Sequence, residues 1–418
     1  MTYTKFNQKG LGLVASSSLF KSTSLNANST TLDLLKEASI IYFNYKDQKY
    51  YSYLPFGNIV LSKIEAVIRD IMNRNGVIEL QLTQIQPLRL WEVDSRLREF
   101  QKNLVYLKGY TSMGERYILS PTNEEVTTLM AKSLLNSYRQ LPISFYQIND
   151  KYRDDSGTKY GILRSNVFRI LEAYSFNRDW SDLDKTAKHF EKLFYEVFKE
   201  FKLKLYSIND RNGYTSLVYF SDIGVTKFLK CLCGFCFYYP KVKKCCSICK
   251  TQYKSYRGTD LAVIMKEGDR YSKYFNAYYL DNNTQRRFFS MGTYAIGISR
   301  LIYALVDKNR DKLGIKWDKK MIPIDFSIIP HNTKDKKQMK YTFEIYDRIK
   351  NSGKNVLLED RQKNIEWKYK FHDFIGIPIQ LVIDDKAVKE KLITLRYRGG
   401  KTQVISLSLY IKSFLNKK

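Results

Sequence analysis

Residues 146–176 read YQINDKYRDDSGTKYGILRSNVFRILEAYSF, and this stretch decides the fold that we predict for the chain. Apolar and aromatic residues alternate with polar ones from Phe145 to Tyr152, turn-forming residues occupy 154–157, and a strand-like pattern resumes at Ile162. Alternation on both sides of a turn is typical of two paired strands. The stretch therefore predicts a hairpin.

Arginines stand on both sides of the predicted turn. Arg153 follows the first strand, Arg164 precedes the second, and a Lys-Tyr-Gly loop at 159–161 lies between them. A planar guanidinium binds two phosphate oxygens at once, so this arrangement suits a polyphosphate. Phe168 is then placed to stack on a base. The alternative is a surface hairpin with ordinary exposed arginines.

The chain of 418 residues is strongly basic, because 70 Lys and Arg against 42 Asp and Glu give a formal net charge of +28. Such an excess favours a polyanionic partner, such as nucleic acid or an anionic membrane surface. Drift toward Lys, Asn, Ile and Tyr in an AT-rich genome would raise the charge without any ligand. No apolar run reaches the roughly 18–20 residues of a spanning helix, so we expect a soluble protein that is not inserted in a membrane.

The first 32 residues contain Lys, Ser, Thr and Asn but no acidic residue. This balance resembles an organellar presequence, although such segments are usually rich in Arg and this one has none. We interpret residues 1–32 as a possible mitochondrial presequence. A flexible tail is the alternative.

An amphipathic helix is predicted from the apolar spacing of Ile59 to Ile71, with Gly76 as its end. The run from Val77 to Ile85 then reads as a strand. A long helix followed by a strand is a common unit of dimer interfaces, and core packing within one chain explains the pattern equally well.

A second helix is predicted to begin after Pro121. The sequence from Thr122 to Glu125 fits a capping box, in which the Thr hydroxyl and the Glu carboxylate satisfy the first backbone N–H groups. This interpretation leaves Glu124 without a role. A carboxylate in the first helical turn beside a pocket could pair with a substrate ammonium.

All six cysteines lie between residues 231 and 249. Two CxxC pairs, Cys233 with Cys236 and Cys246 with Cys249, have the spacing of two zinc knuckles that share one tetrahedral ion. Disulfides are the alternative. Four thiolate ligands leave no open position, so the predicted Zn²⁺ is structural rather than catalytic.

Residues 288–300 run from a strand into a helix. Gly292 and Gly297 permit close backbone approach, and Arg300 lies in the first helical turn, where the helix dipole already favours anions. An arginine at this position can also simply pair with a neighbour.

The composition changes after a charged link at 311–321. From Ile322 onward, strands and helices alternate, with a closing helix expected at 407–415. This order predicts a small α/β domain of roughly 100 residues with a mixed sheet.

Taken together, these segments resemble the prolyl-tRNA synthetases of the bacterial and organellar type. Residues 54–87 loosely match motif 1 of the class II synthetases, 152–176 match motif 2, and 291–300 match motif 3. The stretch 121–125 resembles the proline-recognition loop of the family. The resemblance covers about residues 34–418 and leaves no room for a long editing insertion, in whose place the cysteine segment stands.

The resemblance implies an α+β fold, in which a class II antiparallel sheet is flanked by helices and followed by a C-terminal α/β anticodon-binding domain. The implied domains are a catalytic domain at 33–310 with a Cys-rich insert at 231–253, a linker at 311–321 and an anticodon-binding domain at 322–418. It also implies a homodimeric proline–tRNA ligase that uses ATP, Mg²⁺, proline and tRNA(Pro). The expected location is the mitochondrial matrix, or else the cytoplasm of a bacterium with an AT-rich genome.

Carried over residue by residue, the family pattern assigns Arg153 to the α-phosphate, Arg300 to the γ-phosphate and Asp155 to the adenine amino group. Phe168 would cover the adenine face. Thr122 and Glu124 would hold the proline amine. Arg164 and Gly297 complete the implied ATP site, in which Arg153 and Arg300 are the catalytic residues.

The chain departs from the family pattern at several positions. The departures are Thr83 for Pro in motif 1, Asn123 for His in the recognition loop, Val167 for Glu and Leu171 for Lys in motif 2, and Val263 for His and Lys266 for Gln before motif 3. They keep open a second hypothesis, a catalytically impaired synthetase-like protein that acts as an RNA-binding or accessory subunit.

Overall fold

The computed structural model describes residues 15–20, 25–44, 49–92, 96–108, 114–155, 161–209, 213–222, 224–238, 245–246 and 248–406. Three predictions lie outside these ranges: the tip of the turn with Lys159 and Tyr160, the first fourteen residues, and the closing helix at 407–415. The described chain divides into two compact units. The larger holds Phe43–Tyr51 and Ile64–Leu305, and the smaller holds the described parts of Met1–Tyr42, Ser52–Lys63 and Val306–Lys418.

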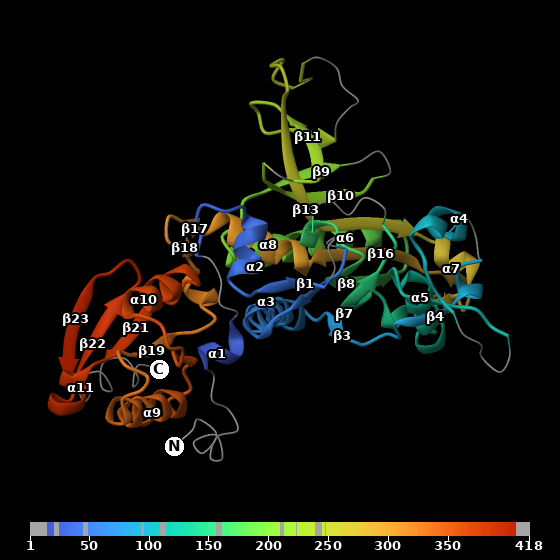
Figure 1. Cartoon of the computed structure of the whole chain (residues 1–418). Coiled ribbons are helices and arrows are strands. Elements are labelled where there is room, and N and C mark those ends of the chain that lie inside the picture. The colour runs from blue at the N-terminus through green and yellow to red at the C-terminus, as the bar shows by residue number, and fades with distance from the viewer. Residues whose placement is uncertain are drawn as a thin grey trace. The chain divides into compact units, whose positions relative to one another are not determined.

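A nine-stranded sheet forms the centre of the larger unit, with the order β12-β11-β13-β16-β8-β7-β3, and with β10 paired to β13 and β9 to β10 (Figure 1). Every described pairing is antiparallel except that of β3 with β7. The strands are β3 (Ile78–Glu79), β7 (Ile143–Tyr152), β8 (Val167–Asn177), β9 (Leu205–Asn209), β10 (Thr215–Phe220), β11 (Thr226–Lys230), β12 (Cys236–Tyr238), β13 (Lys254–Gly268) and β16 (Ser290–Gly297).

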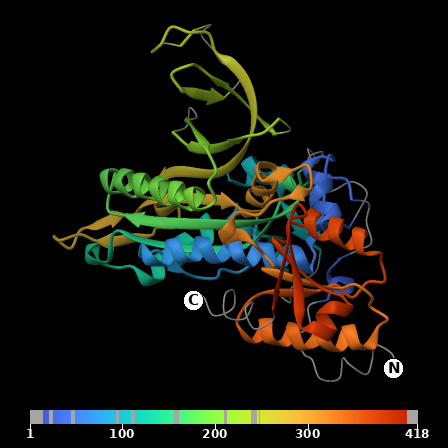
Figure 2. The same cartoon turned by 90° about the vertical axis from the view of Figure 1, so that its left-hand side faces the viewer.

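Helix α6 packs along the sheet against β8, β13 and β16. Beyond it, β11, β12 and the first half of β13 rise from the sheet as an arm (Figures 1 and 2). The helices and smaller strands of this region are α3 (Pro55–Arg74), α4 (Arg96–Phe100), α5 (Glu124–Leu134), α6 (Trp180–Glu200), α7 (Arg270–Tyr274), α8 (Ile298–Lys308), β4 (Ile85–Pro87), β5 (Val105–Leu107), β6 (Tyr117–Leu119), β14 (Tyr278–Leu280) and β15 (Arg286–Phe288). Together these elements form the predicted antiparallel sheet flanked by helices.

The predicted hairpin is confirmed. β7 and β8 pair in an antiparallel register that sets Tyr146 opposite Ala173 and Lys151 opposite Phe168. The second strand begins at Val167 rather than at Ile162, because Gly161–Leu163 form a 3-10 turn in which Ile162 and Leu163 are buried.

The predicted amphipathic helix is confirmed as α3, after which Gly76 adopts a φ of 75°. The predicted strand from Val77 to Ile85 is mostly wrong, since only Ile78–Glu79 pair with β7. Side chains interrupt the ladder beyond that point: the Gln147 amide oxygen accepts from Leu82 N at 3.1 Å, and the Thr83 hydroxyl donates to Ile85 O at 2.9 Å.

Helix α7 leads into the short strand β14. Tyr274 ends helix α7, whose last turn is closed by a hydrogen bond from Phe275 N to Tyr271 O at 2.9 Å. Asn276 then takes a left-handed φ of 50°, so that strand β14 begins only at Tyr278.

The smaller unit contains the predicted mixed sheet, with the order β20-β19-β21-β22-β23. β19 is parallel to β20 and β21, whereas β22 is antiparallel to β21 and to β23. Helix α11 and strand β23 were not predicted. The elements are β19 (Phe326–Pro330), α9 (Lys336–Asn351), β20 (Val356–Leu358), α10 (Ile365–Phe374), β21 (Ile379–Ile383), α11 (Asp385–Glu390), β22 (Leu392–Tyr397) and β23 (Thr402–Ser406), preceded by β17 (Arg310–Asp311) and β18 (Gly314–Ile315).

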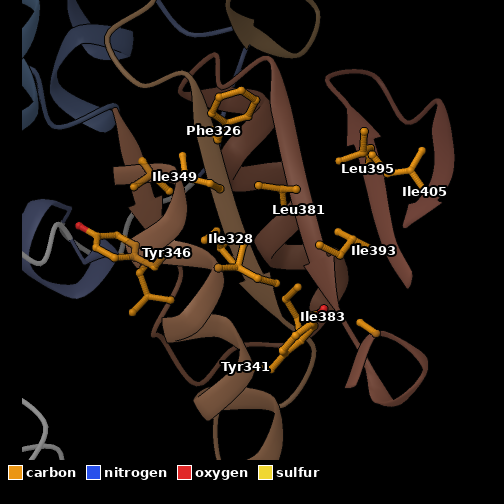
Figure 3. Close-up of a cluster of buried hydrophobic side chains, with 14 residues drawn as sticks. Phe326, Ile328, Tyr341, Tyr346, Ile349, Leu381, Ile383, Ile393, Leu395 and Ile405 are labelled. Carbon is orange, nitrogen blue, oxygen red and sulfur yellow. The ribbon is translucent and has the colours of Figure 1, made fainter. Parts of the chain in front are cut away.

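The core of this sheet is apolar and closely packed. Ile345 and Ile349 from α9 lie against Ile328 and Leu381 of the parallel strands, and Ile393 extends the cluster to β22 (Figure 3). These side chains are fully buried. Burial of this kind stabilises the fold by about 25 cal/mol per Å² of apolar surface.

The described part of the N-terminal segment is packed within the smaller unit and is not a flexible tail. Its helices are α1 (Ser16–Leu19) and α2 (Thr31–Glu37). The Phe20 ring lies 5.1 Å from Phe56 and 5.0 Å from Phe371, and Arg310 donates to Ala27 O at 2.9 Å. Burial of Phe20 explains this difference from the expected tail. None of the described helices combines the length and the apolar composition needed to cross a bilayer.

Candidate active site

A cavity of about 890 Å³ opens in the larger unit beside the β7–β8 hairpin and strands β13 and β16. The structure brings every residue of the predicted ATP and proline sites to its wall. These residues are Thr122, Glu124, Arg153, Asp155, Arg164, Phe168, Gly297 and Arg300. They come from four separate segments of the sequence, so their convergence is a property of the fold.

Arg153 follows β7 and is held in place by the backbone of the recognition loop. Its Nε and Nη2 donate to Pro121 O at 3.2 and 3.1 Å. The guanidinium lies 5.2 Å from the centre of the Phe168 ring, which approaches from the partner strand. Burial lowers the pKa of Arg153, and the neighbouring carboxylates of Glu172 and Glu124 oppose that shift. The side chain therefore presents a fixed positive charge to the cavity.

Arg300 is anchored in a similar way. It is the third residue of α8, and its Nε and Nη1 donate to Leu163 O at 2.9 Å and Asp260 O at 3.0 Å. Both acceptors are backbone carbonyls, so the positive charge is not cancelled by a carboxylate in these contacts. Gly292, by contrast, is required by packing, because a Cβ there would lie 2.1 Å from the Tyr294 hydroxyl oxygen.

Arg164 and Asp155 contact each other across the loop. Nε and Nη2 of Arg164 donate to the two carboxylate oxygens of Asp155 at 2.7 and 3.1 Å. The Asp155 carboxylate, which the family pattern assigns to the adenine amino group, is thus already paired with an arginine that is 45% exposed. A base that used Asp155 would have to share it with Arg164.

Glu124 is the first residue of α5 and lies beside the arginines. The Thr122 hydroxyl donates to Glu124 Oε2 at 2.5 Å, and Arg96 Nη2 donates to the same oxygen at 3.3 Å. Within the described chain both of these hydrogen bonds use Oε2, which leaves Oε1 for a ligand. A carboxylate held in this way suits a substrate ammonium.

The predicted capping box at Thr122–Glu125 is wrong. The residue before α5 is Asn123, and its side chain makes no capping hydrogen bond. The Thr122 hydroxyl binds Glu124 instead, and Glu125 Oε1 accepts from Arg96 Nε at 2.9 Å. Arg96 thus contacts both glutamates at the start of the helix.

Arg96 is a site residue that sequence reasoning missed. It precedes Glu124 by 28 residues and belongs to no motif, so only the fold reveals the contact. Its guanidinium is packed 4.5 Å from the centre of the Phe100 ring. Burial raises the pKa of Glu125 to about 7, with the nearby Glu124 charge adding to the rise.

A buried polar network lies beneath this site. Lys151 Nζ contacts Glu172 Oε2 at 2.9 Å and Ser120 Oγ at 3.0 Å, and the Lys151 side chain is fully buried. The Asn123 amide completes the network when its oxygen accepts from Lys151 Nζ at 2.8 Å and its nitrogen donates to Ser120 Oγ at 2.6 Å. Burial lowers the pKa of Lys151, whereas Glu172 favours the charged form. Asn123, which replaces the family's His, therefore has a structural role here.

The departures before motif 3 are clarified by the strand geometry. Val263, Met265 and Glu267 alternate along β13 and line the cavity. Lys266 is not among the lining residues, and its ammonium contacts Asp184 at 2.7 Å. The cavity-facing position that follows Val263 and Met265 is thus occupied by Glu267. Leu171 is buried in the sheet, where no ligand reaches it.

Glu267, in the cavity wall, should make the stability of the protein depend on pH. Burial raises the pKa of its carboxyl group to about 7, and the Glu124 charge adds to the shift. In the folded state Glu267 therefore keeps its proton up to a higher pH than in the unfolded state. As a result, the contribution of Glu267 to the free energy of unfolding falls as pH rises from about 4.5 to 7. Glutamine does not titrate, so Glu267→Gln does not lose this part of the free energy of unfolding. We expect its melting temperature to exceed that of the wild type at pH 8 and to match it at pH 4.5.

Circular dichroism melts across this pH range check the prediction. Glu366→Gln removes a carboxylate from an exposed position of α10 and should follow the wild-type profile. A Glu267→Gln profile parallel to that of the wild type would contradict the burial argument.

The cysteine cluster differs from the predicted one in one member. Sulfur atoms of Cys231, Cys233, Cys246 and Cys249 all lie within 4.8 Å of one another. The predicted ligand Cys236 is elsewhere: it opens strand β12, and its side chain is buried with Ile208, Val218 and Phe228. Strand alternation explains the difference, because it turns Cys236 toward the apolar face of the arm.

Family models match both parts of the chain. The model described as "tRNA synthetase class II core domain (G, H, P, S and T)" matches residues 108–309, and the model "Anticodon binding domain" matches 325–417. The chain is 27% identical over 395 residues to the proline–tRNA ligase of Ehrlichia ruminantium (strain Gardel), with 88% of this chain and 90% of that protein covered. It is 29% identical over 387 residues to the proline–tRNA ligase of Wolbachia sp. subsp. Brugia malayi, with 87% and 90% covered.

Solved structures share the fold. The Giardia lamblia prolyl-tRNA synthetase in complex with prolyl-adenylate superposes with a TM-score of 0.72 at 16% identity, covering 93% of this chain and 77% of that one. The Cryptosporidium parvum enzyme complexed with halofuginone and AMPPNP gives a TM-score of 0.73 at 15% identity, with 95% and 78% covered. With both family models in the expected order and relatives matched over most of their length, this chain belongs to the prolyl-tRNA synthetases, a family of class II aminoacyl-tRNA synthetases.

Proposed function

We propose that this chain is a proline–tRNA ligase, which joins proline to ATP as prolyl-adenylate and then transfers the prolyl group to tRNA(Pro). The observation that carries the proposal is the single cavity in which Arg153, Phe168 and Arg300 lie beside Thr122 and Glu124. A binding module would not require a phosphate site and an amine site in one cavity. The bacterial relatives named above carry the same activity in their names.

The first step needs positioning and charge neutralisation more than a covalent nucleophile. Glu124 would hold the proline amine, which leaves the carboxylate of proline directed at the α-phosphorus. Arg153 would bind the α-phosphate, where negative charge develops as the carboxylate oxygen attacks and pyrophosphate leaves. Phe168 would cover the adenine ring. Arg300 would hold the γ-phosphate and so favour the bent form of ATP.

Mg²⁺ is a further part of the proposed chemistry. When bound, it neutralises charge on the phosphates. Mg²⁺ in nucleotide sites needs only one or two protein carboxylates, because phosphates and water supply the other ligands. Asp260 is the candidate ligand, because it lines the cavity and its carboxylate charge acts on Arg300. Its two carboxylate oxygens also accept from the Thr226 and Tyr238 hydroxyl groups, and a bound ion would share them.

The second step requires tRNA, and we propose that residues 322–418 contact its anticodon while 33–310 catalyse the reaction. The smaller unit brings two cationic groups from the segment before α10 to an aromatic ring in the first turn of that helix. The Arg361 guanidinium lies 4.6 Å from the Trp367 ring centre, and Lys363 Nζ lies 5.5 Å from the same ring. Such pairs can stack on unpaired bases and neutralise phosphates. The net charge of +28 supports the same partner.

A homodimer is proposed from the edge of the catalytic sheet. In the described chain β3 is the last strand of the main sheet order, and Ile78 on it is 49% exposed; the nearby Ile85 is 50% exposed. Exposed apolar side chains at a sheet edge favour a partner subunit. Sedimentation of the purified protein measures this directly, and a monomer at micromolar concentration would contradict it.

The cellular location follows the translation system that the enzyme serves. The proline–tRNA ligases to which the chain is 27–29% identical are bacterial, and this supports a bacterial-type translation system. The mitochondrial matrix stays a proposal that rests on the acid-free N-terminal composition. Because Phe20 is buried, a presequence removed without loss of packing would end before Ala15. Import of a reporter fused to residues 1–14 tests this.

Amino-acid-dependent pyrophosphate exchange with the purified protein tests the proposed activity. Exchange above background with proline, and not with the other nineteen amino acids, is the expected result. ATP turnover without any amino acid dependence would overturn the ligase assignment. It would instead favour the alternative hypothesis of a catalytically impaired synthetase-like protein, which none of the comparisons supports.

A further inference from the structure

The geometry points to a structural Zn²⁺ site formed by Cys231, Cys233, Cys246 and Cys249 at the tip of the arm. Their sulfur atoms lie within 4.8 Å of one another. Four sulfurs at about 2.3 Å from a central zinc are about 3.8 Å apart in a tetrahedron. The Cys233 and Cys246 sulfurs, which come from the two different halves of the cluster, are 3.8 Å apart. The site rests on the cysteine geometry alone and is independent of the proposed ligase activity.

Each half of the cluster is a tight turn. After Cys233, Gly234 has a φ of 89°, and its N–H donates to Cys231 O at 3.1 Å. After Cys249, Lys250 has a φ of 60°, and its N–H donates to Cys246 O at 3.0 Å. A left-handed residue after the second cysteine thus turns both halves back toward the shared centre. The cost of a left-handed lysine implies that the turn is fixed by its surroundings.

A backbone N–H is directed at one sulfur of the cluster. Ile248 N donates to Cys246 Sγ at 3.4 Å, a backbone hydrogen bond that stabilises negative charge on sulfur. Zn²⁺ with four thiolates carries a net charge of −2. Lys230 precedes Cys231 and pairs with Lys254 of β13, so the segment that carries the cluster is basic.

The two remaining cysteines have other positions. The Cys236 thiol donates to Gly234 O at 3.2 Å, and its side chain is 6% exposed within the apolar cluster of the arm. Cys245 is exposed and forms a β-bridge with Gln252. All six cysteines are free in the structure. Four of the six cysteines thus form the cluster, so substitution of the other two serves as a control.

The ion would fasten the arm at its far end. It joins the turn between β11 and β12 to the segment that enters β13. β13 then continues into the catalytic sheet, where the Asp260 carbonyl accepts from Arg300. The site would hold the arm strands together where their hydrogen-bonded ladder ends. It takes no part in the chemistry, because none of the four cysteines lines the cavity.

Metal analysis of the tag-free full-length protein, purified under reducing conditions without chelator, tests the proposal. We expect one zinc per chain in the wild type. The zinc content of Cys231→Ser should be at least about tenfold lower than that of the wild type. Cys236→Ser and Cys245→Ser should keep one zinc per chain. Hydrogen exchange of residues 226–238 and 248–258 should become faster in Cys231→Ser than in Cys245→Ser. Proline-dependent exchange activity reports whether each variant is folded.

Cobalt substitution in the wild type avoids reliance on any variant. Cobalt bound by four thiolates in a tetrahedron gives intense visible absorption with sulfur-to-metal charge transfer, and this spectrum is the expected result. Three outcomes would overturn the proposal: zinc-free protein with six free thiols, an intramolecular disulfide among the four cysteines by mass spectrometry, or zinc that Cys236→Ser loses and Cys231→Ser keeps.

Discussion

Arg153→Ala should reduce proline-dependent pyrophosphate exchange by about 10²- to 10³-fold, the cost typical of removing one fixed donor from developing negative charge. The guanidinium is held by two hydrogen bonds to Pro121 O and by the Phe168 ring, so its position is set before ATP binds. A fixed charge needs no reorganisation during the reaction, which is why its loss is expected in kcat as well as in KM. The change is measured from the exchange rate at saturating ATP and proline.

Arg164→Ala is the matched control. Arg164 lines the same cavity but is 45% exposed and already paired with Asp155, so we expect a loss of less than about tenfold. tRNA binding by filter retention should be nearly unchanged in both variants. Equal losses of exchange and of tRNA binding in Arg153→Ala would contradict its assignment to the α-phosphate and indicate general disruption.

Glu124→Gln should raise the KM for proline by about 10²-fold and leave the KM for ATP nearly unchanged. The carboxylate is oriented by the Thr122 hydroxyl and by Arg96, and the amide cannot supply the charge that an ammonium requires. Loss of one partner from a buried charge pair costs about 2–5 kcal/mol, which corresponds to this range. Exchange kinetics with proline varied at fixed ATP measure the effect.

Glu125→Gln separates charge from position. The two glutamates are adjacent and share Arg96, but burial raises the pKa of Glu125 to about 7, so its neutral form is already accessible near neutral pH. We expect only a small change in the KM for proline, with a stability gain at pH 8. A larger kinetic effect from Glu125→Gln than from Glu124→Gln would exchange the roles assigned to the two residues.

The parts of the fold that depend on local pattern were predictable. Alternation along 145–152 and the turn residues after it set up the β7–β8 hairpin, and the register then follows from the pairing of its strands. The helix α3 and the alternation of strands and helices after Ile322 follow in the same way from periodicity. These features need only neighbouring residues, which a single sequence provides.

Contacts between distant segments were not predictable. The capping-box prediction failed because α5 begins only at Glu124 and because Arg96, in another helix, binds Glu125. The cysteine prediction failed at one ligand because spacing cannot show that strand β12 turns Cys236 inward. Likewise, Glu267 lines the cavity, whereas the Lys266 ammonium contacts Asp184. Their places in the sequence do not show which of the two faces the cavity. In each case a tertiary neighbour decided between two locally acceptable arrangements.

The contacts of the Asn123 amide restrict which side chains fit at this position. Asn123 is fully buried and accepts from Lys151 while donating to Ser120. An imidazole in that space would be larger, and overfilling a packed core costs about 1–3 kcal/mol. It would also have to accept from the ammonium with one ring nitrogen and donate to the serine with the other. Asn123→His should therefore lower the free energy of unfolding unless neighbouring residues such as Ser120 and Lys151 are changed with it.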